Sequence, residues 1–565
     1  FCLVEHGTEK KRIRSLEAVY LMYERMYQAK PEEYCKSILG LTEPKVLLKC
    51  IKIGSLLSYD GFLMHICGRS GIQIIYHNSN ELIFSPEFCE NIRANRRLID
   101  RFLAENRAIY GVTTGFGENV RYVIPPEEAK TLQRNIVRSH ACAVGEPLTE
   151  EEARAVMLMT IMNAGKAHSG IRLETLERIR QFLNRNITPY APGEGSVAYL
   201  SVEAHLALTY IGEGYILEKG QKVPTAQVLE REGLEPLELE CKEGLSMLNG
   251  TISVTAFGLL ASYDSILAAK NAEIAGVLCY EALRGTPKAL DARIHAAKAH
   301  PEQQQAAQLM RDMLAGSELC EKHAGDKVQD SCLLRAMPQV HASIRRLVGE
   351  AQTAIVEEMH SISDNPEIFG TEDGDGVALM CGNFDGTFVG SHADIIGMAC
   401  AIAGKETERS ISRMVDRNLN DGLPAFLVAE PGLNNGMMIP QYVAAGLVNE
   451  IKLLAIPASI DSIPTCAGQE DPVSMSYNAA RRACQAVRKL DYVIAIEIMV
   501  ALQAIDMLPE KQSPVTARLH DQVRRQVAYA KEDRFFQPDI EALFQMVRSG
   551  ELVNTAEAQL GRSMM

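Results

Sequence analysis

HADIIGMACAIAGKETERSISRMV, residues 392–415, is the stretch of sequence that decides the fold. Its apolar residues recur at three- and four-residue spacing and cover more than one face of a helix, which is typical of a helix buried within a bundle. Residues 479–507 form a second long stretch of the same kind. Two such helices predict an all-α protein whose core is a long central helical bundle.

Shorter helical patterns flank these two stretches, and segments rich in Gly, Pro, Asn and Asp separate them. The helical patterns include residues 87–106, 150–163 and 171–184. The predicted loops are residues 110–119, 189–196, 365–388 and 429–437. Since loops held by a rigid scaffold carry most functional residues, we expect the site residues on such segments.

The chain is long enough for several packed units that share one core. Residues 58–245 are predicted to form an N-terminal domain that has a small mixed start and carries the active-site loops. Residues 246–510 are predicted to form the central bundle, and residues 511–565 a C-terminal helical segment. Residues 1–57 are interpreted as an extension of unknown role, because they carry no recognisable chemistry.

Composition excludes several classes of protein. Hydrophobic residues make up 47% and charged residues 23% of the chain, which is close to the average of globular proteins and far from that of disordered chains. The net charge of -14 repels phosphate backbones and anionic lipid surfaces. No nucleic acid or membrane partner is therefore expected, and a small-molecule substrate is favoured.

The cysteines favour a reducing compartment. There are 14 of them, scattered without the paired spacing of a zinc site, so we expect reduced, mostly buried thiols and no metal. The sequence has no uninterrupted apolar run long enough to span a membrane, and no export signal is recognisable. These features predict a cytoplasmic protein.

The first segment that indicates chemistry is YGVTTGFG, residues 110–117, where three glycines in eight residues allow the conformations of a mobile loop. A glycine-rich turn alone is a weak signal. Further short polar segments interrupt apolar stretches of the sequence downstream. They include LQRNIVRSHA (132–141), KEGLSMLNGT (242–251), DKVQD (326–330), GNF (382–384) and SIDSIPTCAGQEDPVSM (459–475).

The order of these segments and the residues within them resemble the aromatic amino acid ammonia-lyase family from about residue 75 to residue 545. The resemblance is strongest to the histidine-specific members of that family. The resemblance implies an all-α homotetramer with a long helical bundle. It also implies that loops from three subunits build each active site. The expected reaction is the elimination of an amine from a histidine-like substrate.

The resemblance implies a role for each matching residue. Tyr110 would be the base that removes a proton from the substrate's β carbon, and Asn249 and Arg335 would hold the carboxylate. His140 and Glu470 would bind the imidazole through hydrogen bonds that steer its protonation state. The pocket would be lined by Gln329, Asn383, Phe384 and Tyr199.

One segment departs from the family's pattern. The family forms its electrophile, methylidene-imidazolone, by cyclising an Ala-Ser-Gly triplet, and this triplet is missing between Ala198 and Tyr199. Two explanations are open: the modified group is not represented in the sequence, or the protein lacks it. We favour a true absence, because Tyr199 and Val202 also replace the aspartate and proline that the family carries beside the triplet.

The missing triplet changes the expected chemistry. The electrophile turns a primary amine into a better leaving group. A quaternary ammonium has no lone pair with which to attack it, and already leaves as a neutral amine. Our leading interpretation is therefore a cofactor-free lyase that resembles the ergothionase branch of the family and releases trimethylamine from ergothioneine, giving thiourocanate. Tyr110, Tyr199 and Phe384 would offer aromatic faces to the trimethylammonium group.

Two alternatives remain open at this point. The first is a histidine ammonia-lyase, which converts histidine to urocanate and ammonia, with the cofactor triplet missing only from the sequence as printed. The second is a catalytically inactive structural homologue. The second fits the missing triplet but gives no reason for retaining Tyr110, Arg335 and Glu470.

Overall fold

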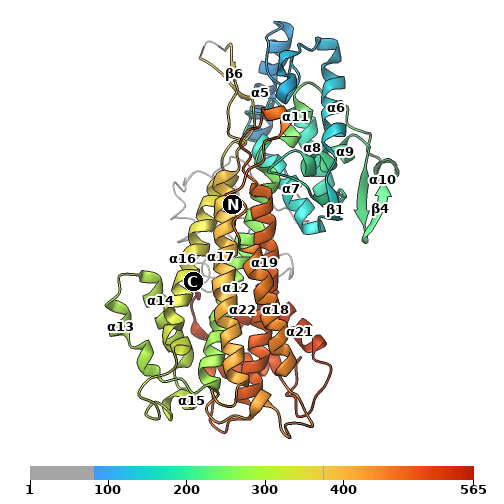
Figure 1. Ribbon diagram of the computed structural model, residues 1–565. Coiled ribbons are helices and arrows are strands. Elements are labelled where there is room, and N and C mark those ends of the chain that lie inside the picture. Colours follow the sequence, from blue (N-terminus) through green and yellow to red (C-terminus); the bar gives the residue numbers. More distant parts are fainter. Residues whose placement is uncertain (1–81, 373) are drawn as a thin grey trace, which may run out of the picture.

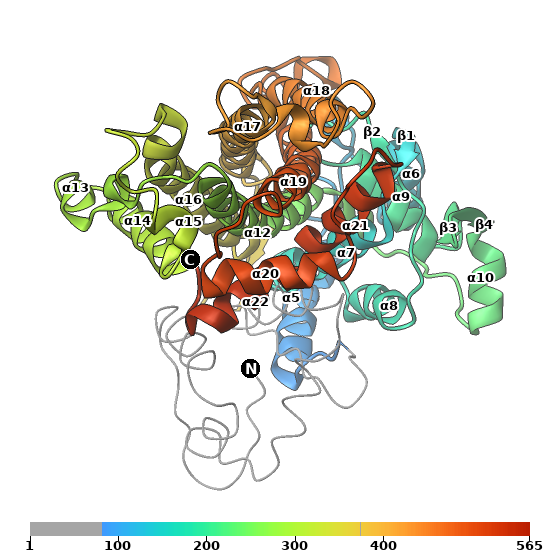
Figure 2. The ribbon, with the colours of Figure 1, turned by 90° about the horizontal axis from the view of Figure 1, so that it is seen from below.

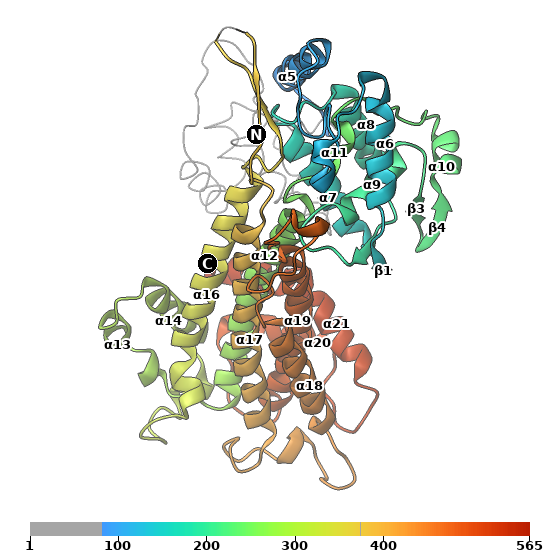
Figure 3. The same ribbon diagram turned by 45° about the horizontal axis from the view of Figure 1, so that its top comes forward.

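The computed structural model describes residues 82–372 and 374–565 (Figure 1). The predicted extension at residues 1–57 and the mixed start predicted after it lie outside the described residues. Within them, long helices run side by side as a bundle, and a smaller group of helices and short strands lies at one end of it (Figures 1 and 3). The prediction of an all-α protein with a long central bundle is confirmed.

The bundle explains the apolar stretches of the sequence. It consists of α12 (Ile252–Ala282), α16 (Cys332–Met359), α17 (Thr387–Val415), α18 (Met438–Leu454) and α19 (Ser476–Ile505). Helices α17 and α19 pack against each other and both pack against α12, as the view from below shows (Figure 2). From Val493 to Ile505 every residue of α19 is buried, so this half of the helix is enclosed on all sides.

Two segments, Glu243–Ala282 and Thr387–Val415, are long and apolar enough to cross a membrane by length and composition alone. Both belong to the bundle, where neighbouring helices bury 72% and 56% of their most apolar windows. Their hydrophobicity is therefore accounted for in large part by packing within the chain.

The N-terminal group of elements begins with α5 (Pro86–Ala104), which Ser85 caps by accepting a hydrogen bond from the Phe88 N–H at 3.1 Å. Thr149 and Glu152 form a capping box that starts α7. The other helices are α6 (Ala129–His140), α7 (Glu150–Ala164), α8 (Leu173–Asn184), α9 (Ser201–Tyr210), α10 (Thr225–Glu232) and α11 (Glu243–Leu248). The short helices are η1 (Gly117–Arg121) and η2 (Pro126–Glu128). The antiparallel strand pairs are β1 (Val144–Pro147) with β2 (Pro192–Glu194), and β3 (Tyr215–Glu218) with β4 (Gln221–Pro224).

The remaining elements extend the bundle and connect its helices. Beside α16 lie η3 (Pro287–Leu290), α13 (Ala292–Ala296), α14 (Pro301–Leu314) and α15 (Glu318–Glu321). The connections include the hairpin β5 (Glu367–Phe369) and β6 (Val377–Leu379), η4 (Ala425–Leu427) and η5 (Cys466–Gly468). The chain ends in α20 (Pro514–Arg524), α21 (Gln537–Arg548) and α22 (Glu551–Leu560). The predicted division after residue 245 falls within α11, and the division into domains stays a prediction.

Small residues bring the loop before α17 close to the start of α19. A Cβ atom at Gly386 would overlap the Ser476 hydroxyl, and one at Gly390 would lie 2.7 Å from the Ser476 Cβ. No larger side chain fits this approach without displacing α19. The loop that carries Phe384 is thereby held at the end of the bundle that faces the N-terminal elements (Figure 3).

Candidate active site

The loop that carries Tyr110 is fixed to its surroundings by hydrogen bonds. The buried Gln133 side chain of α6 donates to the Gly111 carbonyl at 3.0 Å and accepts from the Leu245 N–H of α11 at 3.1 Å. The Tyr110 hydroxyl accepts a hydrogen bond from the Gly117 N–H at 2.9 Å. The glycine-rich segment that the sequence suggested as a mobile loop is thus bonded to two helices.

Gly111 is required by both conformation and space. Its φ of +67° lies in the left-handed region, and a Cβ at this position would lie 2.5 Å from the Leu245 Cδ2 and 2.8 Å from the Phe116 ring. The Phe116 ring packs edge-on against Tyr110, with ring centroids 6.3 Å apart. Gly111 therefore sets the direction in which the adjacent Tyr110 leaves the backbone.

A second loop, from Thr465 to Glu470, contacts the first. Its backbone closes on itself through a hydrogen bond from the Thr465 N–H to the Glu470 carbonyl at 3.0 Å. The short helices η1 and η5 lie against each other, and a Cβ at Gly117 would overlap the Cys466 sulfur. The loop of the predicted base and the loop of the predicted imidazole-binding carboxylate thus meet, although they are far apart in the sequence.

Tyr199 joins these two loops to a third. It precedes α9, is 7% exposed, and donates a hydrogen bond from its hydroxyl to the Glu470 carboxylate at 3.2 Å. Its ring packs edge-on against Phe384 with centroids 5.4 Å apart. Tyr110, Tyr199, Phe384 and Glu470 therefore form one cluster, which we call the tyrosine cluster.

Burial controls the protonation of both tyrosines. It raises the pKa of Tyr110 above its usual value, and the N–H of Gly117 opposes this by bonding to the phenol oxygen. Burial also raises the pKa of Tyr199, and the neighbouring Glu470 charge adds to the rise. Both side chains are therefore neutral phenols at neutral pH. A base at Tyr110 needs an additional positive charge nearby to become a phenolate.

Asn249 follows α11 and is linked indirectly to the tyrosine cluster along two routes. Its side-chain nitrogen is 3.3 Å from both the Asp364 carboxylate and the Asn365 carbonyl, and Asn365 accepts from the Cys381 N–H, three residues before Phe384. On the other side, the Leu248 carbonyl accepts a hydrogen bond at 3.2 Å from Leu200, the residue after Tyr199.

The other predicted residues of this region make contacts of their own. His140 ends α6, is half-buried, and its Nδ1 lies 3.0 Å from the Ser139 hydroxyl. Burial lowers the pKa of His140, which favours a neutral ring that can both donate and accept. Asn383 is exposed, and its amide donates to Glu367 at 2.7 Å.

Gln329 and Arg335 are not brought to the tyrosine cluster within one chain. Gln329 is exposed, and Arg335 lies in the first turn of α16 and donates to the Asp330 carbonyl at 2.9 Å. The other end of α16, at Met359, is bonded to the N-terminal Lys166. At about 1.5 Å of rise per residue, the length of α16 separates the two ends by roughly 35 Å.

The segment before α9 does not fit the family's electrophile. That group needs an Ala-Ser-Gly triplet, whereas Ala198 is followed here by Tyr199, Leu200 and Ser201, and the next glycine is Gly212. The Leu200 N–H is bonded to α11, and the Tyr199 side chain is committed to Glu470 and Phe384. We therefore derive no catalytic step through this group.

A buried ion pair next to Asn249, formed by Lys242 and Asp364, was not predicted from the sequence. The Lys242 ammonium donates to the Asp364 carboxylate at 2.7 Å, and both side chains are 0% exposed. Lys242 lies in KEGLSMLNGT, a segment that carried the resemblance. The signal that could have identified the pair is the position of Lys242 at the start of an apolar helix, because a lysine that is buried there needs a charged partner.

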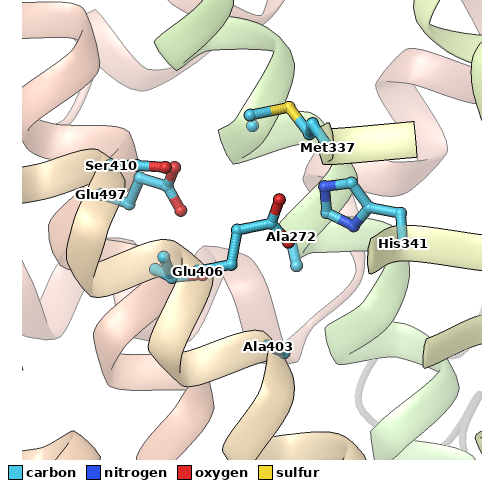
Figure 4. A pocket seen from close by; sticks show the side chains of 9 residues that line it. Ala272, Met337, His341, Ala403, Glu406, Ser410 and Glu497 are labelled. Carbon is cyan, nitrogen blue, oxygen red and sulfur yellow. The ribbon is translucent and has the colours of Figure 1, made fainter. Parts of the chain in front are cut away.

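A cavity in the middle of the bundle contains no residue of the tyrosine cluster (Figure 4). The side chains of His341, Glu406 and Glu497 point into it from α16, α17 and α19. Both oxygens of Glu406, one of Glu497 and the Nε2 of His341 have no hydrogen-bond partner among the described residues. Unpartnered carboxylates are costly to bury, which favours protonated carboxyl groups here.

The sequence profile described as "Aromatic amino acid lyase" matches residues 70–525. The chain belongs to this family. A relative in Symbiobacterium thermophilum named histidine ammonia-lyase is 41% identical over 85% of the chain and 95% of its own length. The protein is thus a carbon–nitrogen lyase, which confirms that part of the prediction. Residues 1–136 also match the profile of the PAM-interacting domain of the endonuclease Cas9, but this covers less than half of the chain and assigns no family.

Solved structures agree with the family assignment. The histidine ammonia-lyase of Trypanosoma cruzi has a TM-score of 0.79 and 34% identity over 88% of the chain and 93% of its own. A tyrosine aminomutase of Streptomyces globisporus has a TM-score of 0.79 and 35% identity over 84% and 94%. The ergothionase of Treponema denticola has a TM-score of 0.78 over 85% and 96%, but its identity of 24% shows only that the fold is shared.

Proposed function

We propose that this lyase removes the α-amine from a histidine-type substrate and leaves a double bond between its α and β carbons. The observation that carries the proposal is the tyrosine cluster, in which the loops of Tyr110 and Glu470 meet and to which Asn249 is linked through the Leu248–Leu200 hydrogen bond. The cluster combines a candidate base, a carboxylate for the imidazole and a polar wall for the amino acid group.

Histidine itself is the first candidate substrate. The relatives support it, because those named histidine ammonia-lyase are 39–43% identical to this chain, whereas the ergothionase structure is 24% identical. This reverses the order of preference reached from the sequence, where the missing triplet favoured ergothioneine. The products would be urocanate and ammonia.

Trimethylamine release from ergothioneine is the second candidate, and one observation favours it. Tyr199 occupies the segment where the family has its triplet, and its ring together with Phe384 forms an aromatic wall. Such a wall attracts a quaternary ammonium by about 0.5–2 kcal/mol per ring. This amine needs no electrophile in order to leave.

The chemistry of either substrate uses the same residues. Tyr110, as a phenolate, accepts the proton from the β carbon, and the electrons of that bond form the new double bond. The bond between the α carbon and nitrogen breaks, and its electron pair leaves with the nitrogen as a neutral amine. Since the departing group is cationic beforehand, its charge favours the phenolate of Tyr110 while substrate is bound. Glu470 and His140 hold the ring that takes up negative charge.

A homotetramer is part of the proposal, because Gln329 and Arg335 lie too far from the tyrosine cluster in one chain to bind the same substrate. An exposed apolar surface on and after α18 supports assembly. It consists of Ile439, Tyr442, Leu453, Ile456 and Ile460, which are 55–80% exposed. The expected mass in solution is four times 62.2 kDa.

The test supplies histidine and ergothioneine separately to the purified protein and measures the unsaturated acid and the released amine. We expect urocanate and ammonia from histidine. Tyr110→Phe is the matched control, because it removes only the hydroxyl. Trimethylamine from ergothioneine without urocanate from histidine would establish the second candidate, and no product from either would reject the proposal. An intact mass that matches the sequence verifies that no cyclised triplet is present.

A further inference from the structure

The orientation of the Asn249 side chain is fixed by a buried charged residue, Asp364. Its side-chain nitrogen lies 3.3 Å from the Asp364 carboxylate and 3.3 Å from the Asn365 carbonyl, and both of these atoms are acceptors. The amide has only two N–H groups, and both are therefore donated within the protein. Among the described residues, no donor reaches the other edge of the amide, its Oδ1.

The reverse orientation is excluded by electrostatics. Turning the amide by 180° would place Oδ1 against the buried Asp364 carboxylate, so that two acceptors would face each other. Asp364 forms an ion pair with Lys242 at 2.7 Å, and neither side chain is exposed. Lys242 also donates to the Ser246 hydroxyl at 3.1 Å, which anchors it to α11, the helix that Asn249 ends.

We propose that Asn249 binds the ammonium group of the substrate through its Oδ1, and that the Lys242–Asp364 pair holds it in this orientation. This inference rests on the proposed function. The resemblance had implied that Asn249 holds the carboxylate, but a carboxylate needs a donor, and the amide has none left. An acceptor in this position binds an N–H group.

The orientation selects among leaving groups. A primary ammonium presents three N–H donors, whereas a trimethylammonium presents none and cannot bond to Oδ1. The site therefore discriminates in favour of amines that carry at least one N–H, which is the property of histidine and not of ergothioneine. Binding sites that are built to hydrogen-bond a polar group reject analogues that lack it, because the site's own polar atom is left unpaired.

The contact also predicts a kinetic signature. The hydrogen bond is strongest while the nitrogen is cationic, and it weakens as the bond to the α carbon breaks and the amine becomes neutral. Asn249 thus stabilises the bound substrate more than the transition state. Its loss should therefore raise KM about tenfold or more and leave kcat unchanged or somewhat higher. Lys242 and Asp364 act as positioning residues through Asn249.

The experiment measures binding of four ligands by calorimetry to the Tyr110→Phe tetramer, in which the turnover of histidine is slowed by the loss of the base. The ligands are histidine, Nα-trimethylhistidine, imidazolepropionate, which lacks the amine, and histamine, which lacks the carboxylate. We expect histidine to bind about tenfold or more tightly than trimethylhistidine. Adding Asn249→Ala should abolish this preference and leave the loss caused by removing the carboxylate unchanged, as a double-mutant cycle separates the two.

Asn271→Ala is the matched control, since Asn271 is also buried and donates both amide hydrogens to backbone carbonyls of Leu267 and Val547, away from the site. It should change stability without changing the preference. Equal binding of histidine and trimethylhistidine, or an Asn249→Ala effect that depends on the carboxylate, would overturn the inference. The first result needs no Asn249 variant to fold. Failure of every imidazole ligand to bind would instead reject the proposed function.

Discussion

Replacing Glu497 by Gln should remove a pH-dependent loss of stability from the bundle. Burial raises the pKa of Glu497 to about 8, from an ordinary value of 4.5. It also raises the pKa of Glu406 well above its usual value, and the Glu497 charge adds to that rise. His341, the third titratable group facing the cavity, is uncharged, because burial lowers its pKa to about 3.

The direction in which pH changes the free energy of unfolding follows from proton binding. Between the unfolded and the folded pKa, the unfolded chain has lost the Glu497 proton and the folded chain retains it. The free energy of unfolding therefore falls by up to about 1.4 kcal/mol per pH unit from about pH 5 to pH 8, and then levels off. The whole difference amounts to roughly 5 kcal/mol as an upper bound. Below about pH 4 the effect vanishes.

The assay is chemical unfolding followed by far-UV circular dichroism at pH 5, 6, 7 and 8, since the chain has no Trp for fluorescence. Protein concentration is held constant, because assembly contributes to stability. We expect Glu497→Gln to gain stability over the wild type as pH rises. Glu230→Gln, at an exposed position of α10, is the control and should follow the wild type. An unchanged pH slope in Glu497→Gln would refute the reasoning.

The remaining predictions concern the tyrosine cluster. Tyr110→Phe should lower the rate by ~100- to 10,000-fold while ligand binding survives, as expected for loss of a general base; steady-state kinetics and calorimetry together check this. Glu470→Gln keeps its shape but loses the charge that holds the ring, so both kcat and KM should worsen in the same assay. Gly111→Ala forces a side chain into a φ of +67° at 2.5 Å from Leu245. It should lower both the rate and the melting temperature although Tyr110 is intact, and a normal rate would show that Gly111 does not position this loop.

The sequence was sufficient to predict the fold, because the spacing of apolar residues along the chain shows which helices are buried. Residues 392–415 and 479–507 predicted the two helices that became α17 and α19, with ends shifted by only a few residues at Thr387 and Ile505. A helix that is apolar on every face has to be surrounded by others, whatever those others are. The family and the carbon–nitrogen lyase activity were likewise recognisable from ordered polar segments.

The tertiary structure alone decided which of the candidate residues meet. Tyr199 and Glu470 are 271 positions apart and share a hydrogen bond, whereas Arg335 lies at the opposite end of α16 from the residues with which it was grouped. It also decided which atom Asn249 offers, because the buried Asp364 carboxylate and the Asn365 carbonyl accept its two N–H groups. The type and order of the residues specify which chemical groups the protein contains. The distances between groups, and the orientation of an amide, depend on long-range packing and on neighbours that local sequence does not specify.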